Sequence, residues 1–133
     1  MVTRWYRPLE IVLNLPYDLK ADVFSIGAMM LELYLGEEVF KSSSNIDQLY
    51  WICKVCGLSA WQPALDKMKQ LGIYITPEEP KIYRMTKKLK QDATSLIVNM
   101  LQPAPNTRIS SFDALKHPYF NKFQLSFNRS KRI

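Results

Sequence analysis

The sequence has little of what most catalytic and metal-binding sites are made from: one histidine, two cysteines and four glycines among 133 residues. The glycines are too few for a Gly-rich phosphate loop, and neither G-x-G-x-x-G nor G-x-x-x-x-G-K-[ST] occurs. The metal motif H-E-x-x-H and the nucleophile motif G-x-S-x-G are absent as well. We therefore expect no complete catalytic site in this chain, and no cofactor or metal site of its own.

Long hydrophobic runs are also missing. The longest, residues 23–35, contains Glu32 and is shorter than the roughly 20 residues that span a bilayer. The N-terminal residues lack the apolar core of a signal peptide, and two cysteines cannot build a disulfide framework. These absences predict a protein without a membrane span, located inside the cell in the cytoplasm or the nucleus.

What the chain does have is enough apolar sequence for a core, and an uneven charge. Hydrophobic residues make up 47%, and the formal net charge is +6. Residues 1–80 hold seven basic and ten acidic residues (−3), whereas residues 81–133 hold eleven basic and two acidic ones (+9). We expect the basic half to form solvated loops and a tail. Nucleic-acid binding by residues 81–132 is the least favoured alternative.

Four segments have helical signatures and almost nothing alternates like a strand, which predicts a mainly α fold. The segment 21–35 is apolar around its whole circumference and is followed by Gly36, a typical helix-ending residue. A soluble helix of this kind is buried on all sides, so we expect it to be the central helix. The other helices are expected between Ser44 and Gly57, over 93–101 and between Ser110 and Pro118, with an irregular connector over 58–90.

The cysteines and the histidine are weak candidates for chemistry. Cys53 and Cys56 form C-x-x-C inside an amphipathic helix, with one distant histidine, so a zinc site or a thioredoxin-like use is not expected. We interpret both as small apolar packing residues. His117 precedes Pro118 at a helix end, where a terminal carbonyl or solvent is its expected partner; a catalytic role is the minor alternative.

Several stretches carry a family resemblance. Residues 3–10 (TRWYRPLE) and 21–27 (ADVFSIG) resemble the end of the activation segment and the start of the large C-lobe helix of eukaryotic protein kinases. Residues 106–120 resemble the closing stretch of the same lobe. The resemblance implies an incomplete domain over residues 1–120, the helical distal part of a protein-kinase-like C-lobe, followed by a basic C-terminal tail over 121–133.

The details of these stretches are similar to the CMGC group of Ser/Thr kinases, which includes the cyclin-dependent and mitogen-activated kinases. The T-R-W-Y-R form and the helix near Asp47 with its long connector carry this similarity. Trp61 and residues 69–77 look most like the male-germ-cell-associated and ciliary kinase branch, which adds the cilium as a location. The family transfers the γ-phosphate of ATP to protein Ser or Thr with Mg²⁺, so ATP and Mg²⁺ are the implied cofactors of a full-length relative.

Three residues of the first stretch fall on positions that serve substrate binding and the activation segment in the family. Thr3 falls on the threonine that hydrogen-bonds towards the catalytic loop and shapes the pocket for the residue after the phosphoacceptor. Arg4 and Arg7 fall on arginines that help to hold a phosphorylated segment in some relatives, because the guanidinium fork matches phosphate oxygens. Two ordinary surface arginines are the alternative.

Other residues fall on structural positions. Glu10 falls on the acidic end of the family's A-P-E motif and Arg108 on its buried partner, a pair whose disruption would cost about 3–5 kcal/mol. Asp22 falls on the acid that braces the backbone of the catalytic loop, with a simple helix N-cap as the alternative. The chain departs from the family where Pro8 and Leu9 replace Ala-Pro, which is expected to alter this turn.

The ATP-binding and catalytic motifs of the family have no counterpart in these residues. They are the Gly-rich loop, the strand lysine, H-R-D-x-x-x-x-N and D-F-G, which supply the catalytic base and neutralise phosphate charge. We therefore expect this chain alone to be inactive. The alternative function is a non-catalytic helical module that binds protein substrates or docking partners through residues 45–90. We also expect the isolated chain to fold poorly or to be bound to something, because the central helix needs neighbours on every side.

Overall fold

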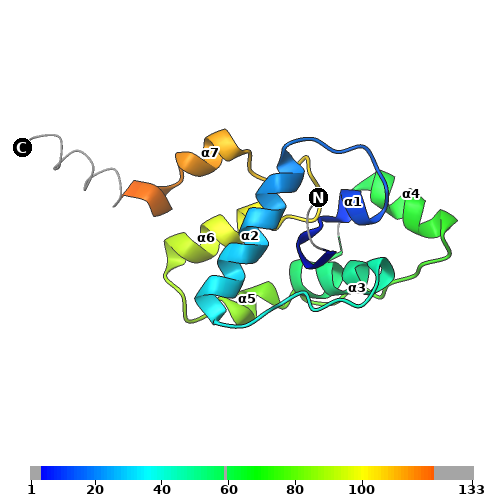
Figure 1. The fold of residues 1–133 in the computed structure, drawn as a ribbon, viewed down its shortest axis with the longest axis horizontal. Coiled ribbons are helices and arrows are strands. Elements are labelled where there is room, and N and C mark those ends of the chain that lie inside the picture. The colour runs from blue at the N-terminus through cyan, green and yellow to red at the C-terminus, as the bar shows by residue number, and fades with distance from the viewer. Residues whose placement is uncertain (1–3, 59, 122–133) are drawn as a thin grey trace, which may run out of the picture.

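The computed structural model describes residues 4–58 and 60–121. Within these residues the chain consists of helices and connecting loops without a strand, as predicted (Figure 1). None of the described helices is long and apolar enough to cross a membrane. Their bounds in chain order are η1 (Arg4–Tyr6), α1 (Leu9–Val12), α2 (Lys20–Leu35), α3 (Asn45–Cys56), α4 (Gln62–Gln70), α5 (Ile82–Met85), α6 (Gln91–Met100), α7 (Ser111–Leu115) and η2 (Pro118–Phe120).

The central element is α2, which crosses α6 in the middle of the molecule (Figure 1). The crossing requires a residue without a side chain, because a Cβ atom on Gly27 would lie 2.8 Å from the Cβ of Met100. On its inner side α2 buries Phe24, Ala28 and Leu31 completely. Together these residues make α2 the element around which the others pack.

The prediction that α2 is buried on all sides is wrong for one of its faces. Ile26, Met29 and Leu33 are 52%, 42% and 84% exposed. Their spacing of three and four residues places them on the same side of the helix. Residues 4–58 and 60–121 leave this face uncovered, because α6 packs on the side that carries Gly27 and η1 packs against Ser25. An apolar circumference predicts burial only when a neighbour is present on every side.

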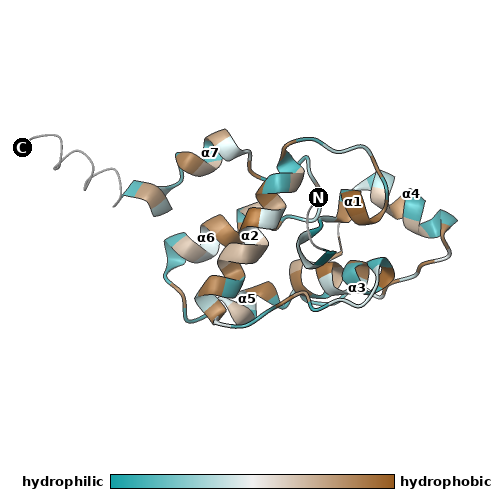
Figure 2. Ribbon diagram, viewed as in Figure 1, coloured by the Kyte–Doolittle hydropathy of each residue, from teal (hydrophilic) through white to brown (hydrophobic). Residues whose placement is uncertain are grey.

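The core has one main cluster and two smaller ones. The main cluster joins α2, α3, α5 and α6 around Phe24 and Phe40, whose ring centroids lie 6.1 Å apart. A second cluster packs α1, which is largely brown in Figure 2, against α3 and the mostly polar α4. Its buried members are Leu9, Leu13, Leu49, Cys53, Ala64 and Met68.

The predicted helix boundaries are confirmed at several ends. The Ser44 hydroxyl accepts a hydrogen bond from the Asp47 amide (3.0 Å) and caps α3. The Ser110 hydroxyl accepts one from the Asp113 amide (3.1 Å) at the start of α7. Gly36 ends α2 in the left-handed conformation at φ +72°. Residues close in sequence therefore determine where these helices begin and end.

The connector over residues 58–90 is less irregular than predicted. It contains the nine-residue helix α4 and the single turn α5. Pro63 occupies the first turn of α4, where proline is tolerated because no intrahelical N–H bond is lost there. The prolines therefore did not indicate irregular structure here. The apolar pattern of α4 did not indicate a helix either, because only Ala64 and Met68 are buried.

Candidate functional site

A buried ion pair fixes the chain just after η1. Glu10 on α1 and Arg108 in the loop before α7 lie 98 positions apart in sequence, and both side chains are 0% exposed. The contact is bidentate, because Arg108 Nη1 donates to Glu10 Oε2 at 2.7 Å and Nη2 donates to Oε1 at 2.9 Å. The structure thus places side by side the two residues that the resemblance pairs.

The remaining guanidinium donors of Arg108 are also satisfied. Its Nε donates to the Gln102 carbonyl (3.0 Å), and Nη1 and Nη2 donate to the carbonyls of Lys20 (2.8 Å) and Pro103 (3.2 Å). The guanidinium carbon lies 5.2 Å from the ring centroid of Phe24. Arg108 therefore uses all five N–H groups and ties α1, the start of α2 and its own loop together.

The segment that carries the predicted arginines is held by Gln48, a fully buried residue of α3. Gln48 Nε2 donates to the carbonyls of Trp5 (3.2 Å) and Arg7 (3.1 Å). Its amide oxygen accepts from the Ser42 hydroxyl at 2.7 Å. The Ser25 hydroxyl of α2 donates to the Tyr6 carbonyl at 2.7 Å. Side chains from two helices thus fix the backbone of η1.

Arg4 and Arg7 project from this fixed backbone. Arg4 is exposed, and its Nη1 donates to the Ser43 carbonyl at 3.3 Å. Arg7 is half-buried, and its Nη1 donates to the Asn45 side-chain oxygen at 3.3 Å. In these two bonds the acceptors are a backbone carbonyl and a side-chain amide oxygen. Thr3, the third residue of this predicted group, lies outside the described residues.

An open cleft of about 720 Å³ lies beside Arg7 and Asp22. Asp22 is exposed and is the third residue of α2, not its N-cap, so the capping alternative is wrong. The start of α2 is instead stabilised by Asp18, whose carboxylate accepts from the Lys20 amide at 2.9 Å. The cleft is lined by Arg7, Ile11, Tyr17, Asp18, Leu19, Ala21 and Asp22. It therefore brings one basic and two acidic side chains to a single opening.

The substituted turn between Arg7 and Glu10 is well accommodated. Pro8 is the N-cap of α1 in extended conformation (φ −74°, ψ 170°), where its missing N–H costs nothing. Leu9 is buried in the second core cluster. The neighbouring Tyr6 hydroxyl donates to Glu32 Oε2 at 2.7 Å, which raises the pKa of Tyr6 above its ordinary value of 10.0.

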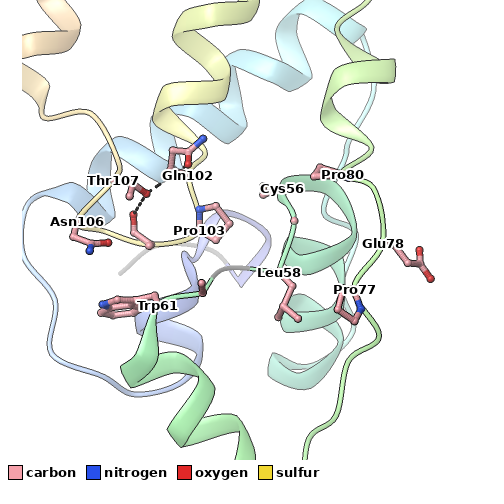
Figure 3. Close-up of a pocket in the computed structure, with 13 residues that line it drawn as sticks. Cys56, Leu58, Trp61, Pro77, Glu78, Pro80, Gln102, Pro103, Asn106 and Thr107 are labelled. Atoms are coloured by element: carbon pink, nitrogen blue, oxygen red, sulfur yellow. Dashed lines mark hydrogen bonds between the residues drawn. The ribbon is translucent and has the colours of Figure 1, made fainter.

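A second cavity, of about 530 Å³, lies between the loop that precedes Arg108 and the connector. Figure 3 shows Trp61 and Thr107 at one end of it and Pro77 with Pro80 at the other. The Thr107 hydroxyl donates to the Gln102 side-chain oxygen at 3.5 Å (Figure 3). This cavity adjoins the backbone that carries Arg108.

The cysteines and the histidine occupy packing roles. Burial raises the pKa of the Cys53 thiol to about 11 and also raises that of Cys56, so both resist ionisation, as expected of apolar packing residues. The ring of His117 contacts protein groups other than the predicted terminal carbonyl. Its Nδ1 accepts from the Tyr119 amide (3.1 Å), and its Nε2 lies 3.0 Å from the Ser95 hydroxyl. Its contacts therefore orient η2.

The described residues do not fit a Mg–ATP site. Within residues 4–58 and 60–121, no three His, Cys, Asp or Glu side chains are grouped so that they could hold a metal ion. The sequence also offers no Gly-rich stretch to surround phosphates. The family resemblance alone therefore implies ATP and Mg²⁺.

Comparison with known proteins identifies that family. The protein kinase domain profile matches residues 1–120. The chain belongs to the protein kinase family. Its relatives are mitogen-activated, cyclin-dependent and glycogen synthase kinases, so the CMGC assignment is confirmed. The tail predicted over 121–133 lies, apart from its first residue, outside the described residues.

Three relatives illustrate the extent of the kinase match. Mitogen-activated protein kinase 13 of Bos taurus is 33% identical over 130 residues, which are 93% of this chain and 36% of that protein. Cyclin-dependent kinase B2-1 of Oryza sativa subsp. japonica is 33% identical over 124 residues, 91% of this chain and 38% of that protein. The solved structure of a MAP kinase from Leishmania major has a TM-score of 0.81 at 26% identity, covering 91% of this chain and 38% of that chain. The chain thus spans about a third of the length of these kinases.

Proposed function

We propose that this chain forms the substrate-facing, helical part of a CMGC Ser/Thr kinase C-lobe and transfers no phosphate by itself. The observation that carries the proposal is the fixed backbone of residues 4–10. Gln48 and Ser25 hold one end of it and Arg108 holds the other. Such a segment can present side chains to a peptide with little loss of conformational entropy.

The chemistry of the open cleft supports a role in positioning rather than in bond making. Arg7 supplies a cation for an anionic group of the activation segment, and Arg4 supplies a second one nearby. Asp22 supplies an exposed carboxylate that can accept hydrogen bonds from the backbone of a catalytic loop. Arg4 and Arg7 are thus positioning residues in this proposal, because the phosphoryl group and its base belong to other parts of a kinase domain.

A transfer assay tests the proposal directly. The purified 133-residue chain is incubated with γ-labelled ATP and Ser/Thr peptides, and binding of a fluorescent ATP analogue is measured in parallel. An active CMGC kinase serves as the positive control, and far-UV circular dichroism verifies that the chain is folded. We expect neither transfer nor ATP binding. Transfer by the chain that is lost in Thr3→Ala or Asp22→Asn would overturn the proposal.

A second candidate function is protein docking through residues 45–90. It is favoured by a cavity of about 320 Å³ between α3 and the connector, with the exposed Tyr50 and Tyr74 at its rim. Quantitative pull-downs with the wild type, with Tyr50→Ala/Tyr74→Ala and with the control Phe112→Ala, an exposed aromatic residue outside 45–90, would test it. Partners lost only from the double variant support docking here, and partners retained by it exclude this cavity.

The setting that suits these functions is the reducing interior of a cell. Cys53 and Cys56 are free thiols, a state that reducing compartments maintain. The cytoplasm, the nucleus and, through the branch resemblance, the cilium are the proposed locations. Localisation of a tagged chain by microscopy tests this, and secretion into the medium would contradict it.

A further inference from the structure

The segment from Lys81 to Lys90 separates its side chains into an inner and an outer set. Ile82 and Thr86 are buried, and Met85 and Leu89 are half-buried against the main core cluster. Ile82 and Met85 belong to α5, and Thr86 and Leu89 lie in the turn and bend that follow it. The outer set, which we name the basic surface, consists of exposed side chains only: Lys81, Arg84, Lys87, Lys88 and Lys90.

The backbone beneath the basic surface is held in place. The Thr86 hydroxyl donates to the Ile82 carbonyl at 2.7 Å, and the Thr94 hydroxyl of α6 donates to the Thr86 carbonyl at 3.2 Å. The Lys81 amide donates to the Lys54 carbonyl at 3.1 Å. The last bond brings exposed Lys54 of α3 to one end of the surface and adds a further positive charge.

Among residues 4–58 and 60–121, no carboxylate forms an ion pair with the basic surface. The ion pairs among the described residues are Glu10–Arg108 and Glu38–Lys41, and neither involves this surface. The carboxylate of Asp92 is engaged at the start of α6, where it accepts from the Ala93 amide at 2.8 Å. The sequence of residues 122–133 contains no acidic residue that could compensate. Five like charges within ten residues repel one another, and a bound anion would relieve that repulsion.

The limits of the basic surface indicate the length of its partner. Exposed Glu78 and Glu79 precede it and Asp92 follows it, so it is a short positive region bordered by negative charge. A long polyanion such as a nucleic acid would extend across these acidic borders, whereas a short anionic segment would not. Tyr83 lies between Lys81 and Arg84 in sequence, is 56% exposed, and offers an aromatic ring to an apolar neighbour of the anion.

We propose that the basic surface binds a short acidic segment of a partner protein, in which carboxylate side chains are clustered. Arg84 provides the bidentate contact, and the lysines provide point charges that can follow several carboxylate spacings. The proposal does not depend on phosphate transfer or on the cleft beside Arg7. It can therefore fail or succeed separately from the proposed function.

The test compares two variants of the full chain that lose the same number of positive charges. The first is Lys81→Gln/Arg84→Gln/Lys88→Gln. The matched control removes exposed cations elsewhere and is Lys41→Gln/Lys69→Gln/Lys116→Gln. Fluorescence anisotropy measures binding of a labelled glutamate-rich peptide of ten residues at low salt, with a glutamine-rich peptide as the blank. We expect about a tenfold loss of affinity in the first variant and less than about twofold in the control.

A charge-reversed variant shows whether the surface itself recognises charge. Lys81→Glu/Arg84→Glu/Lys88→Glu is expected to bind a lysine-rich peptide that the wild type does not bind, while circular dichroism stays unchanged. Equal losses in the two neutralised variants would overturn the proposal, because net charge alone would then explain binding. So would absence of peptide binding by the folded wild type. Tighter binding of a DNA oligonucleotide of equal charge, or of phosphatidylserine vesicles, would equally overturn it.

Discussion

The two ion pairs among residues 4–58 and 60–121 lie in regions of opposite character. Glu10 and Arg108 are both 0% exposed and join segments far apart in the sequence. Glu38 and Lys41 are 48% and 62% exposed, lie three residues apart and approach to 3.5 Å. Each pair joins a glutamate to a cation, a guanidinium in the first and an ammonium in the second, but water screens only the second pair. The burial of an ion pair therefore determines how much free energy of unfolding is lost when one partner is removed.

Removal of one charge from the buried pair is expected to have the largest effect. Arg108→Met leaves the Glu10 carboxylate buried without a partner, which lowers the free energy of unfolding by about 3–5 kcal/mol. Urea unfolding followed by circular dichroism measures this. The double variant Glu10→Leu/Arg108→Met should regain much of the loss, because no buried charge remains. A loss below about 1 kcal/mol in the single variant would show that water reaches the pair.

Gln48 tests whether a neutral buried group anchors the same segment as strongly. Gln48→Ala leaves the carbonyls of Trp5 and Arg7 without their donor, and we expect a loss of about 1–3 kcal/mol. The matched control is Gln62→Ala on α4, where the exposed side chain donates to Asp66 and its loss should cost less than about 0.5 kcal/mol. Equal urea midpoints for the two variants would refute an anchoring role of Gln48.

Tyr6 and Glu32 allow an intermediate, half-buried contact to be tested by pH. The hydrogen bond to Glu32 raises the folded-state pKa of Tyr6 above 10.0, so folding favours the protonated hydroxyl. The resulting stability is fully present below the unfolded pKa and is lost as the pH rises through the folded pKa. Urea unfolding from about pH 8 to about pH 12 should therefore show a steeper decline for the wild type than for Tyr6→Phe. Parallel curves would contradict this linkage.

The exposed pair is expected to contribute least. Lys41→Ala removes a charge that is 62% exposed and should change the free energy of unfolding by no more than about 0.5 kcal/mol. Raising the salt concentration should make even this difference disappear, since exposed pairs are screened. A loss approaching that of Arg108→Met would break the comparison between the two regions.

The parts of the fold that could be predicted are those determined by nearby residues. Ser44, Ser110 and Gly36 act on the backbone within three or four positions, and the helix ends that they indicate are confirmed. The extent of α6 could be predicted because its apolar face is regular. α1 and α4 could not, because one is a single turn and the other buries two side chains only.

The candidate site was predictable only through the family resemblance. Glu10 and Arg108 are separated by 98 positions, and no local sequence pattern predicts their contact. Gln48 has no signal in the sequence, since an isolated glutamine on a helix is ordinarily exposed. Asp18 could have been found, because an Asp two residues before a helix is a common local hydrogen-bond acceptor. The exposed face of α2 was missed because burial depends on neighbours that hydropathy does not reveal.

The distance in sequence between Glu10 and Arg108 also sets an order of events during synthesis. Glu10 is synthesised first, and its partner is made 98 residues later. Until then the unpaired Glu10 carboxylate favours water over the core, which opposes the docking of α1 even though Leu9 has apolar neighbours on α3 and α4. The segment that carries Arg4 and Arg7 can therefore reach its final position only after residue 108 has been made, which makes its docking a step of high contact order.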